Sequence, residues 1–167
     1  LVVISYILQV PIVTDEESVY ASLQKYYPQV KPVYIREHQK ILEYLSQHYD
    51  TLFVSCANYR RDLSPLFEII FRRQVSFWYC PHGNSDKPMT QFKLQNHTLV
   101  YGDQMIDRLD EMGVTPGFDS YVRTGNYRFP FYKEHEAFYD QIAEDEVFSQ
   151  FEKKQTTLMY APTWRDL

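Results

Sequence analysis

One stretch decides the fold: Val75-Ser76-Phe77-Trp78-Tyr79, followed by Cys80-Pro81 and then by His82-Gly83-Asn84-Ser85-Asp86-Lys87. The aromatic-rich run that ends at a proline predicts a β-strand. An imidazole, a glycine and an ammonium group therefore follow directly after a strand. In open α/β sheets, ligands bind outside the carboxyl ends of the strands. We therefore expect this loop to contact an anionic, phosphorylated substrate.

Short strand-like runs alternate with helical patterns on both sides of this stretch. The expected strands are 10–13, 33–35, 51–54, 75–79, 97–101 and 121–123. Apolar residues at helical spacing lie between them, in 14–26, around 41–45, in 64–71 and in 103–112. Strands that alternate with helices are typical of a parallel sheet. The sequence therefore predicts an α/β, Rossmann-like fold in which helices flank a parallel sheet.

Residues with known preferences for helix ends indicate where these helices begin and stop. Thr14 and Glu17 have the spacing of a capping box. Ser64 is expected to cap a helix that opens with Pro65 in its first turn. Asp103 is expected to be an N-cap, and Gly113 has the position of a C′ glycine.

The two ends of the chain suggest how it is divided. Residues 1–8 are apolar, but they carry no basic region and are too short to span a bilayer, so we expect a structural element of a shortened chain rather than a signal peptide. A helical stretch begins near Pro130, and 156–160 reads as a strand. We expect an acceptor-side domain over 1–129, a helical crossover over 130–155 and the start of a truncated second domain over 156–167. Alternatively, 156–160 returns to the first sheet as its last strand.

Composition excludes several classes of function. The chain has 167 residues, a net charge of −5 and no long basic run, which argues against an extended nucleic-acid surface. Its two cysteines form no disulfide framework, so a reducing cytoplasm is the expected setting. All five glycines lie between Gly83 and Gly125, so neither a dinucleotide-binding loop nor a Walker A motif is present, and we expect no cofactor. The histidines and cysteines have no zinc-ligand spacing, and no metal is expected.

The loop after the fourth strand holds the first candidate site. His82 can act as a general base, and Asp86 can orient its ring. Gly83 lets a ligand approach the backbone, and Lys87 adds a positive charge. The alternative is that His82 is a structural histidine, which is the commoner role for a single histidine.

Two further segments place an arginine after a strand. Gly125-Asn126-Tyr127-Arg128 offers a guanidinium for bidentate contact with a phosphate or a carboxylate, unless it is only an interdomain turn. Tyr160-Ala161-Pro162-Thr163-Trp164-Arg165-Asp166 repeats the pattern near the end of the chain. There the alternative is a loop shaped by Pro162 and Trp164, in which Arg165 pairs with Asp166.

Taken in order, these three segments resemble the CDP-glycerol glycerophosphotransferase family, which includes the teichoic-acid polymerases. The resemblance covers roughly the latter half of the chain, and only the last segment is highly specific. It implies the acceptor-side half of a GT-B fold, in which two Rossmann-like domains face each other across a cleft. This chain departs from the family pattern in the loop 84–86 and at Tyr127. The later segments that bind the CDP group are also absent from it.

The resemblance assigns roles to individual residues. His82 would be the catalytic base and Asp86 its catalytic partner. The substrate would be held by Gly83, Lys87, Asn126, Arg128, Thr163 and Arg165. The donor would be CDP-glycerol or a related activated compound, and the acceptor a hydroxyl group that is lipid-linked in many family members. The parent protein would then work in the cytoplasm, peripherally on the inner face of the membrane.

Two other functions remain open from the sequence. One is a non-catalytic Rossmann-like module that binds a sugar, a nucleotide or a protein in a tyrosine-rich cleft. The other is half of a UDP-sugar glycosyltransferase or epimerase. One scaffold hosts many functions, so fold alone does not separate them.

Overall fold

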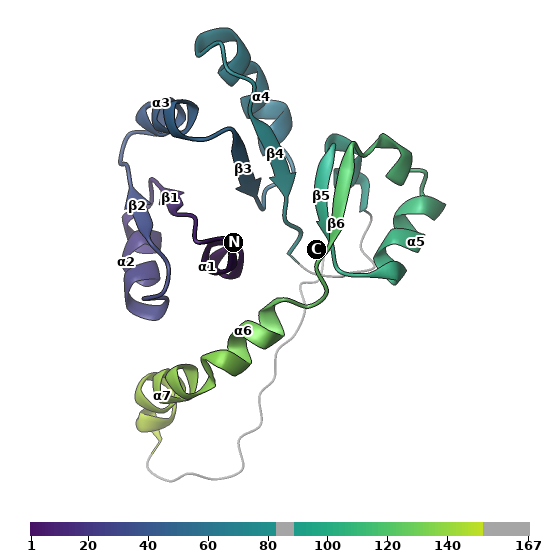
Figure 1. Ribbon diagram of the computed structural model, residues 1–167. Coiled ribbons are helices and arrows are strands. Elements are labelled where there is room, and N and C mark those ends of the chain that lie inside the picture. Colours follow the sequence, from purple (N-terminus) through teal and green to yellow (C-terminus); the bar gives the residue numbers. More distant parts are fainter. Residues whose placement is uncertain (83–88, 152–167) are drawn as a thin grey trace, which may run out of the picture. The chain divides into compact units, whose positions relative to one another are not determined.

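The computed structural model describes residues 1–82 and 89–151 (Figure 1). The chain forms two compact units, 1–127 and 128–167. In the first unit, helices and short strands alternate. Its helices are α1 (Val2–Leu8), α2 (Glu17–Tyr26), α3 (His38–His48), α4 (Tyr59–Ile70) and α5 (Asp103–Glu111), with 3-10 turns η1 (Met89–Leu94) and η2 (Thr115–Gly117). Its strands are β1 (Ile12–Thr14), β2 (Pro32–Tyr34), β3 (Thr51–Val54), β4 (Ser76–Tyr79), β5 (His97–Val100) and β6 (Ser120–Arg123).

All strand pairs in the described part of the first unit are parallel, which confirms the predicted α/β, Rossmann-like class. Four strands form one sheet in the order β3-β4-β5-β6. The remaining two, β1 and β2, pair only with each other. The described strands therefore form two parallel sheets, where the alternation in the sequence had suggested one.

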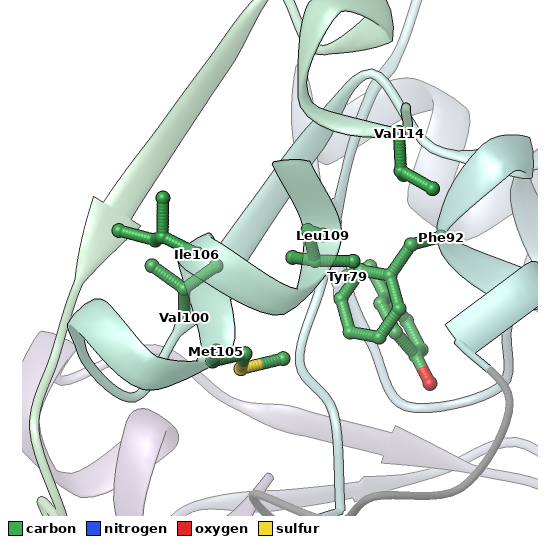
Figure 2. Close-up of a cluster of buried hydrophobic side chains, with 7 residues drawn as sticks. All are labelled: Tyr79, Phe92, Val100, Met105, Ile106, Leu109 and Val114. Atoms are coloured by element: carbon green, nitrogen blue, oxygen red, sulfur yellow. The ribbon is translucent and has the colours of Figure 1, made fainter. Parts of the chain in front are cut away.

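One face of the four-stranded sheet is covered by α3, α4, η1 and α5. Val54 and Phe77 pack against Leu42 of α3 and Phe67 of α4. Farther along the sheet, a second cluster joins η1, β5 and α5 around the side chain of Tyr79 (Figure 2). Its buried members are Tyr79, Phe92, Val100, Met105, Ile106, Leu109 and Val114.

The opposite face of the same sheet packs against α1. Ile4 of α1 is buried together with Cys80 and Leu99. Half-buried Phe53, Trp78 and Tyr127 surround this cluster. The apolar segment at the start of the chain is thus a helix of the core, in keeping with the expectation that it is a structural element.

Helix α4 begins earlier than predicted. The expected start was Ser64-Pro65, yet the helix runs from Tyr59 and contains Pro65 in its interior. Leu63, Leu66 and Phe67 share one apolar side and pack in the same cluster. This packing extends the helix upstream, although an internal proline removes a backbone hydrogen bond.

Two predicted caps are also wrong. Glu16 is the N-cap of α2, and Thr14 instead accepts a hydrogen bond from the Glu16 amide over 3.1 Å, so no capping box forms. Gly102 is the N-cap of α5, because Asp103 is already its first residue. The C′ position of Gly113 is confirmed by its φ of 65° and by the hydrogen bond from its amide to Asp110.

The second unit is described as far as residue 151. It contains α6 (Arg128–Glu134), α7 (Glu136–Glu146) and the 3-10 turn η3 (Phe148–Gln150). The single helical stretch that we expected from Pro130 is therefore two helices, separated at His135. The expected strand at 156–160 lies outside the described residues.

Candidate functional site

The carboxyl ends of β3, β4, β5 and β6 meet at one edge of the sheet, because these strands are parallel and adjacent. His82 follows β4 after Cys80 and Pro81, and it is exposed. The turn at Gly125 follows β6 after Thr124. The fold thus brings one predicted catalytic residue to the edge where parallel α/β sheets bind ligands.

Tyr101 connects these two loops. Its hydroxyl donates a hydrogen bond to the carbonyl oxygen of Pro81, 3.2 Å away, next to His82. Its ring stacks on the ring of Tyr127, with centroids 6.0 Å apart and planes 13° from parallel. Tyr101 is not among the site residues predicted from the sequence. The sequence feature that could have indicated its role is its position, because it is an aromatic residue at the carboxyl end of β5, directly before Gly102.

Backbone geometry fixes the turn after β6. The Thr124 amide and hydroxyl both bond to the carbonyl of Val100, at 2.9 and 3.3 Å. Gly125 then adopts a φ of 61°, a conformation that L-residues with a side chain rarely take. This turn leads the chain to Tyr127, which packs with Cys80 and Leu99 over the sheet face that α1 covers.

An ion pair lies at the same edge. Arg123, the last residue of β6, contacts Asp103 in the first turn of α5 over 2.7 Å. Both side chains are largely exposed, so the pair adds little to stability. It does commit this guanidinium to a carboxylate, which makes Arg123 a poor candidate for binding a substrate anion.

The predicted site residues fall into three groups. His82 and Asn126 lie in the first unit, exposed in the loops after β4 and β6. Arg128 is the first residue of α6 and belongs to the second unit. Five others lie outside the described residues: Gly83, Asp86, Lys87, Thr163 and Arg165.

The two cysteines are free thiols in different surroundings. Cys56 is exposed in the segment after β3, whereas Cys80 is buried at the end of β4. Burial raises the pKa of the Cys80 thiol to about 11, because the thiolate would lose its hydration. Cys80 therefore serves as a small apolar core residue, and it is no nucleophile at neutral pH.

Within 1–82 and 89–151, no cluster of three or more histidine, cysteine or acidic side chains has the arrangement of a metal site. No helix in those ranges combines the length and the apolar character needed to cross a membrane.

The described part of the site can do limited chemistry. An exposed imidazole and two half-buried phenol rings line the edge of the sheet, with an exposed amide at Asn126 nearby in the sequence. An imidazole can accept a proton from a hydroxyl group. Tyrosine is enriched at interfaces, because its ring packs against apolar surface while its hydroxyl finds a hydrogen-bond partner. Comparison of this chain with protein-family models, with curated proteins and with solved structures finds no match.

Proposed function

We propose that this chain is the acceptor-side part of a CDP-glycerol glycerophosphotransferase-like enzyme, which moves a glycerol-phosphate-type group from a CDP-activated donor to an acceptor hydroxyl. The observation that carries the proposal is the exposed position of His82 directly after β4, at the edge of the sheet where the Gly125 turn also lies. The order of the three sequence segments supports the same reaction. So does the parallel α/β fold, which is the class this family uses.

In the proposed reaction, His82 takes the proton from the acceptor hydroxyl. The hydroxyl oxygen forms a bond to the β-phosphorus of the donor, and the bond from that phosphorus to the CMP oxygen breaks. CMP leaves with the electron pair. Lys87, Arg128 and Arg165 stabilise the anionic oxygens, because phosphoryl transfer depends mainly on positioning and charge stabilisation. Asp86 orients the His82 ring, while Gly83, Asn126 and Thr163 contact the substrates.

The proposal also assigns partners and a location. The donor is CDP-glycerol or a related nucleotide-activated compound, bound largely by a donor-side half encoded outside this chain. The acceptor is a hydroxyl group, which is lipid-linked in many members of that family. The parent enzyme is cytoplasmic, and with a lipid-linked acceptor it works at the inner face of the membrane. No cofactor enters the reaction.

The test is turnover of CDP-glycerol by the parent protein, measured as release of CMP. Positioned proton transfer contributes about 10²–10⁴-fold to rate, so His82→Gln should lose activity by that factor and keep its far-UV circular dichroism. His48→Gln is the matched control, because His48 lies on α3 and its ring bonds to the Tyr44 carbonyl at 2.8 Å. Wild-type turnover by the His82→Gln enzyme would refute the role of base.

The substrate arm of the same experiment separates the alternatives. Turnover of UDP-sugars in place of CDP-glycerol would assign the chain to a glycosyltransferase or epimerase. Saturable binding of either nucleotide with no turnover by the parent protein would favour a non-catalytic module.

A further inference from the structure

Each of the two sheets in the described part of the chain has two open edges, and β1 and β3 each form one of them. In β1, the amide of Ile12 bonds to the Lys31 carbonyl and the Thr14 carbonyl accepts from Ile35. Successive residues of a strand direct their backbone groups to opposite edges, so the N–H and C=O of Val13 face away from β2. Within 1–82 and 89–151, no strand pairs with that edge.

Among the described residues, β3 also has one open edge. The carbonyls of Asp50 and Val54 accept hydrogen bonds from Ser76 and Cys80, at 2.9 and 2.7 Å. The backbone groups of Thr51 and Phe53 therefore face away from β4. In the described part of the chain, this edge also has no partner strand.

The sequence of β3 is that of a central strand. Leu52 and Val54 pack on the face covered by α3 and α4, while Phe53 packs on the face covered by α1. Strands that are apolar on both faces are typical of the middle of parallel sheets, and natural edges are instead protected by charge, proline or bulges. By contrast, β6 has exposed Tyr121, Val122 and Arg123, as expected of an edge.

The positions of the helices show where a further strand would fit. Crossovers between parallel strands are right-handed in nearly all proteins. Helices α3, α4 and α5 lie on one face of the sheet. A right-handed crossover requires its helix on that face when the chain advances in the direction from β2 to β3 and on to β6. Helix α1 lies on the opposite face, against Cys80 and Leu99. A right-handed crossover through a helix on this face advances across the sheet in the opposite direction. The strand that precedes α1 must therefore lie on the side of β1 that faces β3.

We infer that one additional parallel strand, which leads into α1 and through it to β1, pairs with β1 on one side and with β3 on the other. The occupant is an extended apolar segment that precedes α1 in the parent chain. It joins the two described sheets into a single seven-stranded sheet in the order β2-β1-new-β3-β4-β5-β6. This inference rests on the strand edges and the helix positions, and it does not depend on the proposed reaction.

The added strand has a consequence for ligand binding. The direction in which the chain advances across the sheet reverses between the new strand and β3, and such reversal points form the ligand crevice of open α/β sheets. The segment 55–58 after β3 then borders this crevice. Among its residues, Cys56 is exposed.

The test is amide exchange and nuclear Overhauser contacts in the parent chain. We expect the hydrogen-exchange rates of the Val13 and Phe53 amides to lie within about tenfold of the rate of the Cys80 amide, which is hydrogen-bonded to Val54 inside the sheet. Both amides should show contacts to one segment that precedes Leu1. The Tyr121 amide provides an internal comparison, because it faces away from β5.

Several outcomes would overturn the inference. Fast exchange at either Val13 or Phe53 would show that the edge is open in the folded protein. Contacts between Val13 and Phe53 themselves would show that β1 and β3 pair directly. Contacts to a segment beyond residue 151, or to a second molecule, would assign the position to another occupant.

Discussion

Tyr101 donates a hydrogen bond to the carbonyl oxygen of Pro81, over 3.2 Å, and thereby links the end of β5 to the loop that carries His82. The same side chain stacks on Tyr127. A residue without a predicted role thus connects the two loops that the sequence singled out. Its hydroxyl and its ring can be tested separately.

The first prediction concerns that hydroxyl. Tyr101→Phe removes the bond to Pro81 and keeps the ring against Tyr127, so the free energy of unfolding should fall by about 0.5–1.5 kcal/mol. Urea denaturation followed by circular dichroism measures the change. Tyr121→Phe is the control, because that side chain is exposed at the outer edge of the sheet and should unfold like the wild type. Equal stability of Tyr101→Phe and the control would show that the hydrogen bond contributes nothing.

The second prediction concerns the turn after β6. Gly125 has a φ of 61°, and an added Cβ would meet no heavy atom within 4 Å, so the cost of Gly125→Ala is backbone strain alone. That strain is about 1–2 kcal/mol. Gly117→Ala is the matched control, because its surroundings are equally open and it has no positive φ. The difference between the two variants in urea denaturation measures the strain, and identical midpoints would contradict it.

The third prediction concerns the dependence of stability on pH. The pKa of Cys80 is raised from 9.0 to about 11, so the folded chain holds this proton more tightly than the unfolded chain does. The resulting stabilisation is complete below pH 9 and is lost as the pH rises towards 11. A shift of this size corresponds to about 2–3 kcal/mol.

The measurement is the free energy of unfolding in urea at intervals from pH 8 to pH 11. Cys80→Ala lowers stability at every pH, because it leaves a void, but it should flatten the decline above pH 9. Cys56→Ala, at the exposed thiol, should keep the wild-type slope. A wild-type slope in Cys80→Ala would show that other groups cause the decline.

The fourth prediction concerns the core beneath the sheet. Phe67 is completely buried between α3 and the sheet, so Phe67→Ala should cost about 3–5 kcal/mol. Ile69 lies two residues along the same helix and is 72% exposed, so Ile69→Ala should change stability by less than about 0.5 kcal/mol. Thermal or urea denaturation of the two variants compares the two sides of α4. Similar losses would mean that Ile69 is covered in the folded protein.

Much of the fold was predictable from local patterns. Short apolar and aromatic runs placed β3 at its observed bounds and the other described strands within about two residues. Helical spacing placed the helices between them, because the burial of apolar side chains leaves such patterns in the sequence. The start of α4 was not predictable. Pro65 reads locally as a first-turn residue, whereas tertiary contacts hold the helix upstream of it. Leu63 packs in the core cluster, and the Arg60 guanidinium donates a hydrogen bond to the Leu94 carbonyl over 2.7 Å. The missing capping box at Thr14 has a similar cause, since β1 extends to Thr14 and delays the start of α2.

The sequence by itself determined the α/β class, the parallel direction of the strands and the position of His82 after one of them. These features depend on periodicity and on chain order, which are local. The tertiary structure alone decided that Tyr101 joins the loops after β4 and β6 and that α1 lies opposite α3 and α4. It also decided that, among residues 1–82 and 89–151, β1 and β3 each have an edge with no partner strand. These features depend on contacts between residues far apart in the chain, and spacing within a single segment carries no information about such contacts.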